Sequence, residues 1–272
     1  MMRGPRSNIQ STLDTPGSGE GHKPMKLVLV VAFLIAVPGL ATAQLWTAGV
    51  EGGNLNEWAL NDCGGEFNSG IADTVASAEQ SRSGNYSAKL TWVGPGDSAT
   101  RLFRWCEPQH NTELYYSAWF FFPRIYKPGL YWNIFQWKSK TASGNDPFFI
   151  LNIGNRSDGN MYFYLYDWQR RASSTQTKLN VPVGRWFQVE AYYKCAADNT
   201  GRVIFWQDGQ LLFDVANLST RYGNGDCQWS LNSYSDSITP GPASFYIDDV
   251  TISANRLNLI GLAAPTDLKI FQ

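Results

Sequence analysis

Short runs of aromatic and β-branched residues are the feature that most constrains the fold of this chain. Clusters of Gly, Asn, Asp and Pro interrupt these runs, as is typical of strands joined by tight turns. Asp208-Gly209 lies between two runs and predicts a two-residue hairpin turn with positive φ. The predicted strands are 88–93, 99–105, 114–122, 131–138, 148–153, 161–168, 186–195, 203–207, 211–215, 228–234 and 244–253. With no long amphipathic helix and no internal repeat, the pattern predicts an all-β jelly roll, a sandwich of two antiparallel sheets.

An apolar segment near the N-terminus has the features of a secretory signal peptide. Lys26 precedes the apolar run 27–37, and Ala41-Thr42-Ala43 fits the cleavage pattern. We therefore assign 1–43 to an N-terminal extension with the signal peptide, 44–256 to the jelly-roll domain and 257–272 to a C-terminal tail or linker. The protein is predicted to be secreted, extracellular or periplasmic; an uncleaved anchor is the alternative.

All four cysteines follow the predicted cleavage site. An even number of cysteines in an exported chain predicts two disulfides. Of the three possible pairings we favour Cys63–Cys106 with Cys195–Cys227, because each pair brackets neighbouring strand segments. Zinc is not expected, since the chain has no C-x-x-C motif. We predict no metal site and no cofactor, although a structural calcium ion is compatible with such sandwiches.

The amino-acid composition limits the classes of binding partner that we expect. The formal net charge of −1 lacks the basic excess of nucleic-acid-binding proteins. The 11 tryptophans exceed what one core requires, so some are expected to line a sugar-binding groove. We predict a monomer that binds a polysaccharide, acidic in character, and neither nucleic acid nor a membrane.

The carboxylates do not favour a glycosidase. Retaining glycosidases on such sandwiches present paired carboxylates on one face of a strand, close enough to act together. Glu190 stands alone in its predicted strand, and the adjacent Asp248 and Asp249 point to opposite faces. Carboxylates on different strands stay open as an alternative.

Amides, cations and a phenol occur instead at strand spacing. Gln136 and Lys138 are two residues apart and share one face of a predicted strand, and Asn232 and Tyr234 do the same in another. These groups suit β-elimination at a uronate, which needs a neutralised carboxylate, a base for the C5 proton and an acid for the leaving oxygen.

Three stretches carry a family resemblance: SGNYSAKLTW (83–92), TELYYSAWFFFPRIY (112–126) and the hairpin that begins VPVGRW at 181 and ends WQDGQLLFD at 214. Together they make the region from about 80 to 253 resemble the polysaccharide lyase superfamily, which includes heparin lyase I-like and alginate lyase-like proteins. This resemblance implies a jelly roll of the concanavalin A-like lectin/glucanase type. Most of the matching residues define the fold, so they are less specific for activity.

The resemblance also implies site residues. Gln136 matches the Gln of the alginate lyase-like Gln-Ile/Val-His strand, and Lys138 stands where that strand has its catalytic His. Tyr234 matches a catalytic Tyr, and Asn232 occupies a Gly position two residues before it. Arg104 matches the closing Arg of an Arg-x-Glu-Leu-Arg strand whose Glu is missing here.

These five residues form the predicted catalytic set. Lys138 or Tyr234 would take the C5 proton, Tyr234 would protonate the leaving oxygen, and Gln136, Asn232 and Arg104 would neutralise the carboxylate. Lys138 and Tyr234 are expected to flank a single sugar ring. Further residues are predicted to bind carbohydrate: Arg101, Trp132, Trp168 and His110, the last because it is the only histidine after residue 43.

The predicted function is that of a secreted polysaccharide lyase that cleaves a uronate-containing polymer by β-elimination. A lectin-like or laminin G-like carbohydrate-binding protein without activity is the alternative. A structural or adhesion protein of the cell surface is a third class, which the sequence favours least.

Overall fold

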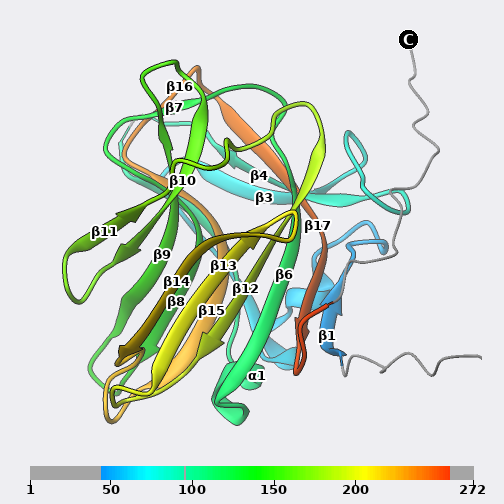
Figure 1. Ribbon diagram of the computed structural model, residues 1–272. Helices are drawn as coiled ribbons and strands as arrows, with labels where there is room; N and C mark the ends of the chain where they lie inside the picture. Colours follow the sequence, from blue (N-terminus) through cyan, green and yellow to red (C-terminus); the bar gives the residue numbers. More distant parts are fainter. Residues whose placement is uncertain (1–43, 95, 258–272) are drawn as a thin grey trace, which may run out of the picture. The chain divides into compact units, whose positions relative to one another are not determined.

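The predicted strand runs form two antiparallel sheets packed face to face in a β-sandwich (Figure 1). The structure is a computed structural model that describes residues 44–94 and 96–257. The predicted signal peptide and residues 258–272 of the predicted tail lie outside the described residues. Every strand predicted from the sequence is present, so the all-β sandwich fold is confirmed.

One sheet has eight strands in the order β14-β13-β12-β6-β17-β4-β3, with β1 also paired to β17. Its strands are β1 (Gln44–Ala48), β3 (Ala72–Ser77), β4 (Ser87–Trp92), β6 (Glu113–Phe121), β12 (Trp186–Lys194), β13 (Gly201–Gln207), β14 (Gln210–Leu218) and β17 (Ala243–Ser253). The predicted hairpin between β13 and β14 is confirmed, because Asp208 and Gly209 have φ values of 47° and 76°.

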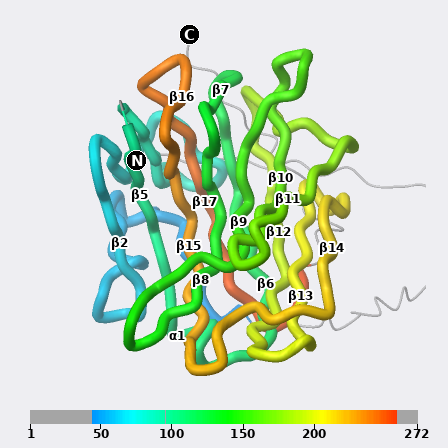
Figure 2. The backbone as a smooth tube through the Cα atoms, turned by 90° about the vertical axis from the view of Figure 1, so that its left-hand side faces the viewer, coloured from blue at the N-terminus to red at the C-terminus, as the bar shows by residue number. Residues whose placement is uncertain are grey.

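The other sheet has seven strands in the order β11-β10-β9-β8-β15-β5-β2, and Figure 2 looks onto its outer side. Its strands are β2 (Gly64–Ser69), β5 (Ser98–Arg104), β8 (Trp132–Lys140), β9 (Asn145–Asn155), β10 (Met161–Asp167), β11 (Ala172–Thr175) and β15 (Asp226–Ser235). The strands β8 and β15 lie at its centre, so side chains on their outer side have neighbours on both flanks.

Short elements complete the described part of the chain. A two-stranded ribbon, β7 (Lys127–Pro128) and β16 (Ile238–Thr239), lies at one end of the seven-stranded sheet (Figure 2). The helix α1 (Cys106–His110) follows β5, and the 3-10 turns Asn56–Trp58 and Leu60–Asp62 precede β2. No helix among the described residues is long and apolar enough to cross a bilayer.

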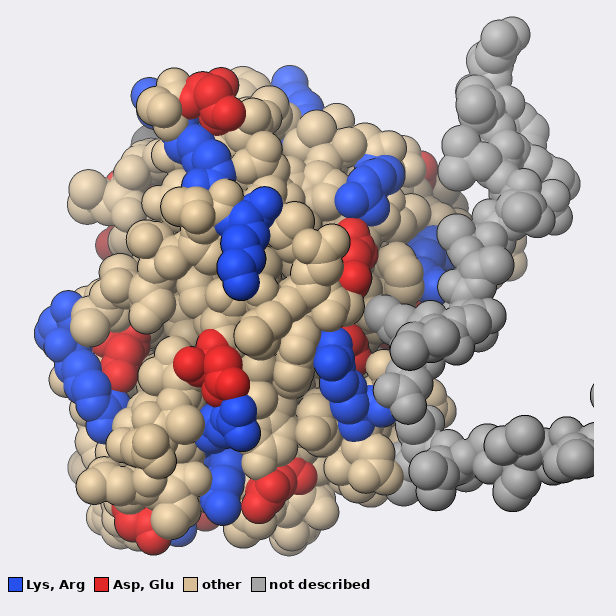
Figure 3. Space-filling model, viewed as in Figure 1, with Lys and Arg blue, Asp and Glu red and all other residues tan. Residues whose placement is uncertain are grey.

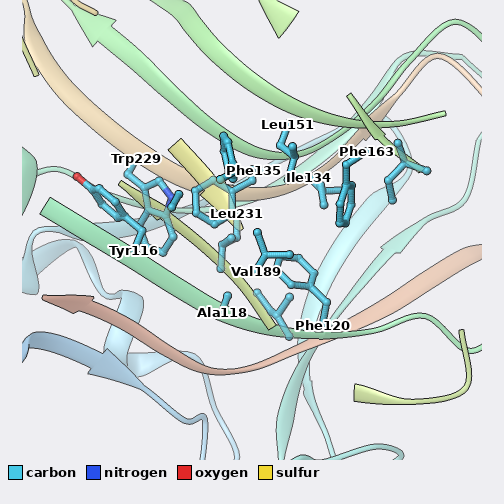
Figure 4. Packing of buried hydrophobic residues seen from close by; sticks show 14 of the residues in the cluster. Tyr116, Ala118, Phe120, Ile134, Phe135, Leu151, Phe163, Val189, Trp229 and Leu231 are labelled. Carbon is cyan, nitrogen blue, oxygen red and sulfur yellow. The ribbon is translucent and has the colours of Figure 1, made fainter. Parts of the chain in front are cut away.

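Aromatic residues from both sheets form the core (Figure 4). Trp137 of β8 stacks on Tyr193 of β12, with ring centroids 4.3 Å apart. Trp229 of β15 packs against Tyr116 of β6 at 5.0 Å. Each ring removes a large apolar surface from water, and aromatic pairs add specific geometry to that burial.

Two disulfides tie the sandwich together. Cys195 follows β12 in the eight-stranded sheet and is bonded to Cys227 of β15 in the other sheet. Cys63, just before β2, is bonded to Cys106, the first residue of α1. The predicted pairing is therefore confirmed, and two structural disulfides are typical of a protein that works outside the cytoplasm.

Removal of the inter-sheet disulfide should destabilise the domain. The bond closes a loop of 32 residues of sequence separation, and cross-links of this kind contribute about 2–4 kcal/mol. We expect the Cys195→Ala/Cys227→Ala variant to lose about that much free energy of unfolding in a denaturant titration. The unmodified protein should show no free thiol after denaturation without reductant. Four titratable thiols would contradict the pairing.

Candidate active site

The predicted polar residues gather on the outer side of the seven-stranded sheet. Across the β8–β15 pair, Gln136 lies opposite Ser230 and Lys138 opposite Gln228. Across the β15–β5 pair, Asn232 lies opposite Arg101. Directly paired residues share a face, and Trp137, Trp229 and their neighbours occupy the inner side. We call this outer surface, from Lys138 through Gln136, Asn232 and Arg101 to Tyr234, the polar face.

The centre of the polar face holds buried polar atoms without protein partners. Asn232 Nδ2 donates a hydrogen bond of 2.9 Å to Asn133 Oδ1, and both residues are buried. Among the described residues, Asn232 Oδ1, Gln136 Oε1 and Arg101 Nε accept or donate no hydrogen bond. Buried polar groups in folded proteins are almost always paired, so each exception asks for an explanation. Three of the ten such atoms among the described residues lie on this one face, which makes it a candidate binding site.

Two cations on this face have no acidic partner. No ion pair within the described part of the chain involves Arg101 or Lys138. The pKa of Lys138 is lowered to about 8, mainly by burial and also by the Arg101 charge, while Asp146 acts in the opposite direction. Burial also lowers the pKa of Arg101. An anion bound here would relieve the repulsion between the two groups.

Charged side chains are arranged differently on another face of the molecule. On the face drawn in Figure 3, Lys and Arg are interspersed with Asp and Glu. Several charged groups of the described surface are paired, as in Arg202 with Asp214 and Arg185 with Asp208. Within the described residues no three His, Cys, Asp or Glu side chains lie together as potential metal ligands. The expectation of a structural calcium ion stays a prediction.

Tyr234 lies at one end of the polar face beside Arg101. The guanidinium carbon of Arg101 is 5.3 Å from the centroid of the Tyr234 ring. The Tyr131 ring meets Tyr234 edge-on at 5.1 Å, and its hydroxyl donates a 2.8 Å hydrogen bond to Asp97 Oδ1. Burial, Tyr234 and Asp97 together raise the pKa of Tyr131 well above its usual value. Tyr131 therefore stays a hydrogen-bond donor to Asp97, and its ring packs edge-on against the phenol ring next to it.

Lys138 and Tyr234 do share a face, but they do not lie across one sugar ring. Lys138 is opposite Gln228 of β15, whereas Tyr234 is six positions further along that strand. Six residues span about 20 Å at roughly 3.3 Å each. The row that contains Asn232 and Arg101 lies between them. The two side chains therefore occupy opposite ends of the polar face.

The prediction that Arg104 lines this face is wrong. Arg104 is three residues from Arg101 on β5, so strand alternation points the two side chains in opposite directions. Arg104 is 2% exposed, pairs with Glu107 at 2.6 Å and donates a hydrogen bond to the Glu57 carbonyl oxygen. Its guanidinium also stacks over Trp46 at 4.2 Å. Arg104 supports the fold, and Arg101 is the arginine of the site.

Simple strand alternation also predicts the wrong face of the sheet for Trp132. An extra residue in β8 shifts its register against β9 between Asn133 and Phe135, so Ile134 and Phe135 both face the core. This bulge turns Trp132 inward, where it is fully buried and donates a hydrogen bond to Ser233 Oγ. The same bulge turns Asn133 outward, onto the polar face. Trp132 is therefore not a stacking platform for sugar.

The remaining predicted residues lie at the margins. Trp168 is half-buried after the end of β10, with the Arg171 guanidinium 4.1 Å from its ring centroid. His110 is exposed at the end of α1, beyond the Arg104 end of β5, and Tyr234 lies at the opposite end of that strand pair. Strand alternation alone would have revealed Tyr162, Tyr164 and Tyr166 of β10, which share the outer side of the sheet.

Comparison with known proteins agrees with this architecture. Residues 50–251 match the family model described as polysaccharide lyase. The chain belongs to this polysaccharide lyase family. The resemblance expected from the sequence motifs is confirmed. Among proteins of curated function, none matches this chain in sequence.

Several solved structures share the fold of this polysaccharide lyase family member. The endo-β-1,4-glucuronan lyase of the fungus Trichoderma reesei aligns with a TM-score of 0.61 and 19% identity, over 78% of this chain and 96% of that chain. The marine PL-14 alginate lyase of Aplysia kurodai aligns at 0.53 with 11% identity, over 77% and 98%. The cellulose induced protein Cip1 aligns at 0.52 with 15% identity, over 78% and 98%. At these identities the likeness establishes the fold.

Stability measurements should separate the two arginines of β5. We expect Arg104→Ala to lower the free energy of unfolding by about 3–5 kcal/mol, because it leaves Glu107 without its buried partner. Arg101→Ala should change it by less than about 1 kcal/mol, since no ion pair is lost. Urea titrations of both variants measure the difference. Equal losses for the two variants would contradict the assignment of Arg104 as the structural one.

Proposed function

We propose that this protein is a lyase that cleaves an acidic, uronate-containing polysaccharide by β-elimination, with the polar face as its active site. The observation that carries the proposal is the Arg101 guanidinium, without an ion-pair partner among the described residues, beside Tyr234 on a face that also holds the unpartnered amide oxygens of Gln136 and Asn232. Such a site suits an anion next to a proton-transfer group. The fold likeness to lyases named for glucuronan and alginate supports the same polymer class.

The carboxylate of the uronate would be held at the centre of the polar face. Arg101 supplies a positive charge, and the NH2 groups of Gln136 and Asn232 are the amide donors for the carboxylate and its developing enolate, one hydrogen of Asn232 Nδ2 being already donated to Asn133 Oδ1. The unpartnered oxygens Gln136 Oε1 and Asn232 Oδ1 are acceptors, which suit sugar hydroxyls. Neutralising this charge makes the C5 proton more acidic, which is the first requirement of the reaction. Asn133 holds the Asn232 side chain through its 2.9 Å hydrogen bond.

Tyr234 would move the proton. Acting as the base, the Tyr234 oxygen takes the proton from C5, and the C–H electron pair forms the C4–C5 double bond. The C4–O bond breaks with its electron pair on the leaving oxygen. The same tyrosine then returns the proton to that oxygen. One residue can serve as base and acid, so Lys138 is not required for proton transfer.

Lys138 would instead bind a carboxylate of the polymer. It lies at the other end of the polar face, on the same side as Arg101 and without an acidic partner among the described residues. An acidic polymer carries further carboxylates along the chain. We assign Lys138 to a neighbouring uronate rather than to the one that reacts.

The reaction type can be read from the product. Elimination produces a C4–C5 double bond conjugated to the carboxylate, which absorbs in the ultraviolet, whereas hydrolysis produces only reducing ends. We expect the absorbance to rise when the protein is incubated with glucuronan or alginate, in a panel with ulvan, heparin and chondroitin. New reducing ends without the absorbance would contradict the lyase proposal. Binding without either signal would support the lectin-like alternative.

Replacement of Tyr234 by Phe removes only the hydroxyl. We expect turnover to fall by roughly 10²-fold or more, with polymer binding nearly unchanged, because the ring packing with Arg101 and Tyr131 is retained. Tyr115→Phe is the matched control, since Tyr115 lies on β6 of the other sheet. Full activity in Tyr234→Phe would remove Tyr234 from the mechanism.

The pH dependence of binding tests Lys138. Below its pKa of about 8 the side chain is charged, and it loses that charge as the pH rises. In the Tyr234→Phe background we therefore expect affinity for an acidic oligosaccharide to fall several-fold between about pH 7 and about pH 9. Adding Lys138→Met should weaken binding at the lower pH and flatten this dependence. An unchanged pH profile after Lys138→Met would show that Lys138 does not contact the ligand.

A further inference from the structure

A pocket lies beside the β7–β16 ribbon and is lined by residues of β7, β9, β10 and β11. The pocket has a volume of about 470 Å³, within the range of small-ligand sites. It is formed by four separate segments of the chain. Its main side chains and backbone positions are Lys127, Leu130, Gly154, Tyr162, Tyr164 and Thr175.

The pocket is continuous with the polar face through a row of paired residues. Tyr164 of β10 lies opposite Asn152 of β9, Asn152 lies opposite Asn133 of β8, and Asn133 lies opposite Tyr234 of β15. Three inter-strand spacings of about 4.8 Å separate the two tyrosines, or roughly 14 Å. A polymer that crosses the strands would therefore reach the pocket a few sugar units from Tyr234.

The Tyr162 ring is held in place as a platform. The Arg156 guanidinium lies 4.8 Å from its ring centroid, and Asn180 and two backbone carbonyl oxygens fix that arginine. Gly154, directly opposite Tyr162 on β9, leaves room for the ring, since a Cβ there would lie 3.1 Å from it. Aromatic rings held in this way bind the apolar face of a sugar at small cost in side-chain entropy.

A cation lies in the lining of the pocket, and an acid lies at its edge. Lys127 is the only charged side chain among its lining residues, and it is exposed. The nearby acid, Asp236, accepts hydrogen bonds from the backbone amides of Leu130 and Tyr131. Burial raises the pKa of Tyr164 to about 12, so its hydroxyl remains a hydrogen-bond donor at neutral pH. Leu130, 84% exposed, adds an apolar rim.

We propose that this pocket is a second sugar-binding site of the protein, which takes a uronate of the same polymer, with the ring against Tyr162 and the carboxylate toward Lys127. The inference rests on the proposed function for its choice of polymer, because the polar face and the pocket would bind one chain. It adds a specific consequence: affinity depends on chain length, and part of that dependence comes from residues remote from Tyr234.

The test compares Tyr162→Ala and Lys127→Ala with Tyr115→Ala and Lys194→Ala, the last two on the opposite sheet. Binding of glucuronan and alginate oligosaccharides of graded length, and of their carboxyl-reduced forms, is measured by calorimetry. We expect Tyr162→Ala to weaken binding of long oligosaccharides roughly ten-fold or more, and of the shortest ones hardly at all. Lys127→Ala should weaken binding of the acidic forms only, and both control variants should bind as the unmodified protein does.

Activity and binding are read separately, so the two proposals can fail separately. Chain-length-dependent losses in a protein that cleaves nothing would support the pocket and overturn the lyase proposal. Cleavage with no loss in either pocket variant at any length would overturn the pocket and leave the lyase proposal standing. Equal losses of acidic and carboxyl-reduced ligands in Lys127→Ala would overturn its role toward the carboxylate. Lys127 is exposed, so its variant tests the site even where Tyr162→Ala fails to fold.

Discussion

The stacking of Trp137 on Tyr193 across the two sheets is the contact on which the site depends. Together with Trp229 against Tyr116 and the Cys195–Cys227 disulfide, it fixes which side of β8 and β15 faces the core. Side chains alternate along a strand, so the residues directly before and after each of these tryptophans must face outward. Gln136 and Lys138 are placed in this way. A change that rotated either strand would remove the polar face along with the core.

The two arginines of β5 show how one strand can serve both the fold and the site. Arg104 faces inward and is neutralised by Glu107, which makes its burial tolerable. Arg101 faces outward, has no acidic partner among the described residues and shares its surroundings with Lys138. An unpaired, half-buried cation is unfavourable for stability alone. The carboxylate of the proposed uronate would neutralise this charge.

The polar face and the pocket near the ribbon form one extended surface across the sheet. Strands β15, β8, β9 and β10 contribute successive residues of a single row from Tyr234 to Tyr164. The sheet is rigid because its inner side is packed against the other sheet, so the spacing between the two ends is set by inter-strand distance. A polymer, rather than a small molecule, matches a surface of this extent. The mixed, paired charges elsewhere offer no comparable site on the face drawn in Figure 3.

The sequence by itself determined most of the strands and the sandwich, because strand periodicity is a local signal, and of its three possible disulfide pairings the favoured one was right. Through the family resemblance it also brought Gln136, Lys138, Asn232 and Tyr234 to one face of one sheet. It could not place Trp132 or Asn133, because the bulge in β8 exists only through its pairing with β9. Strands β1, β2, β3 and β11 and the ribbon β7–β16 were missed, since these short segments become strands only by pairing. Which arginine reaches the site, how far Lys138 lies from Tyr234, and the pocket built from four separate segments were decided by tertiary structure, because each depends on register between strands distant in sequence.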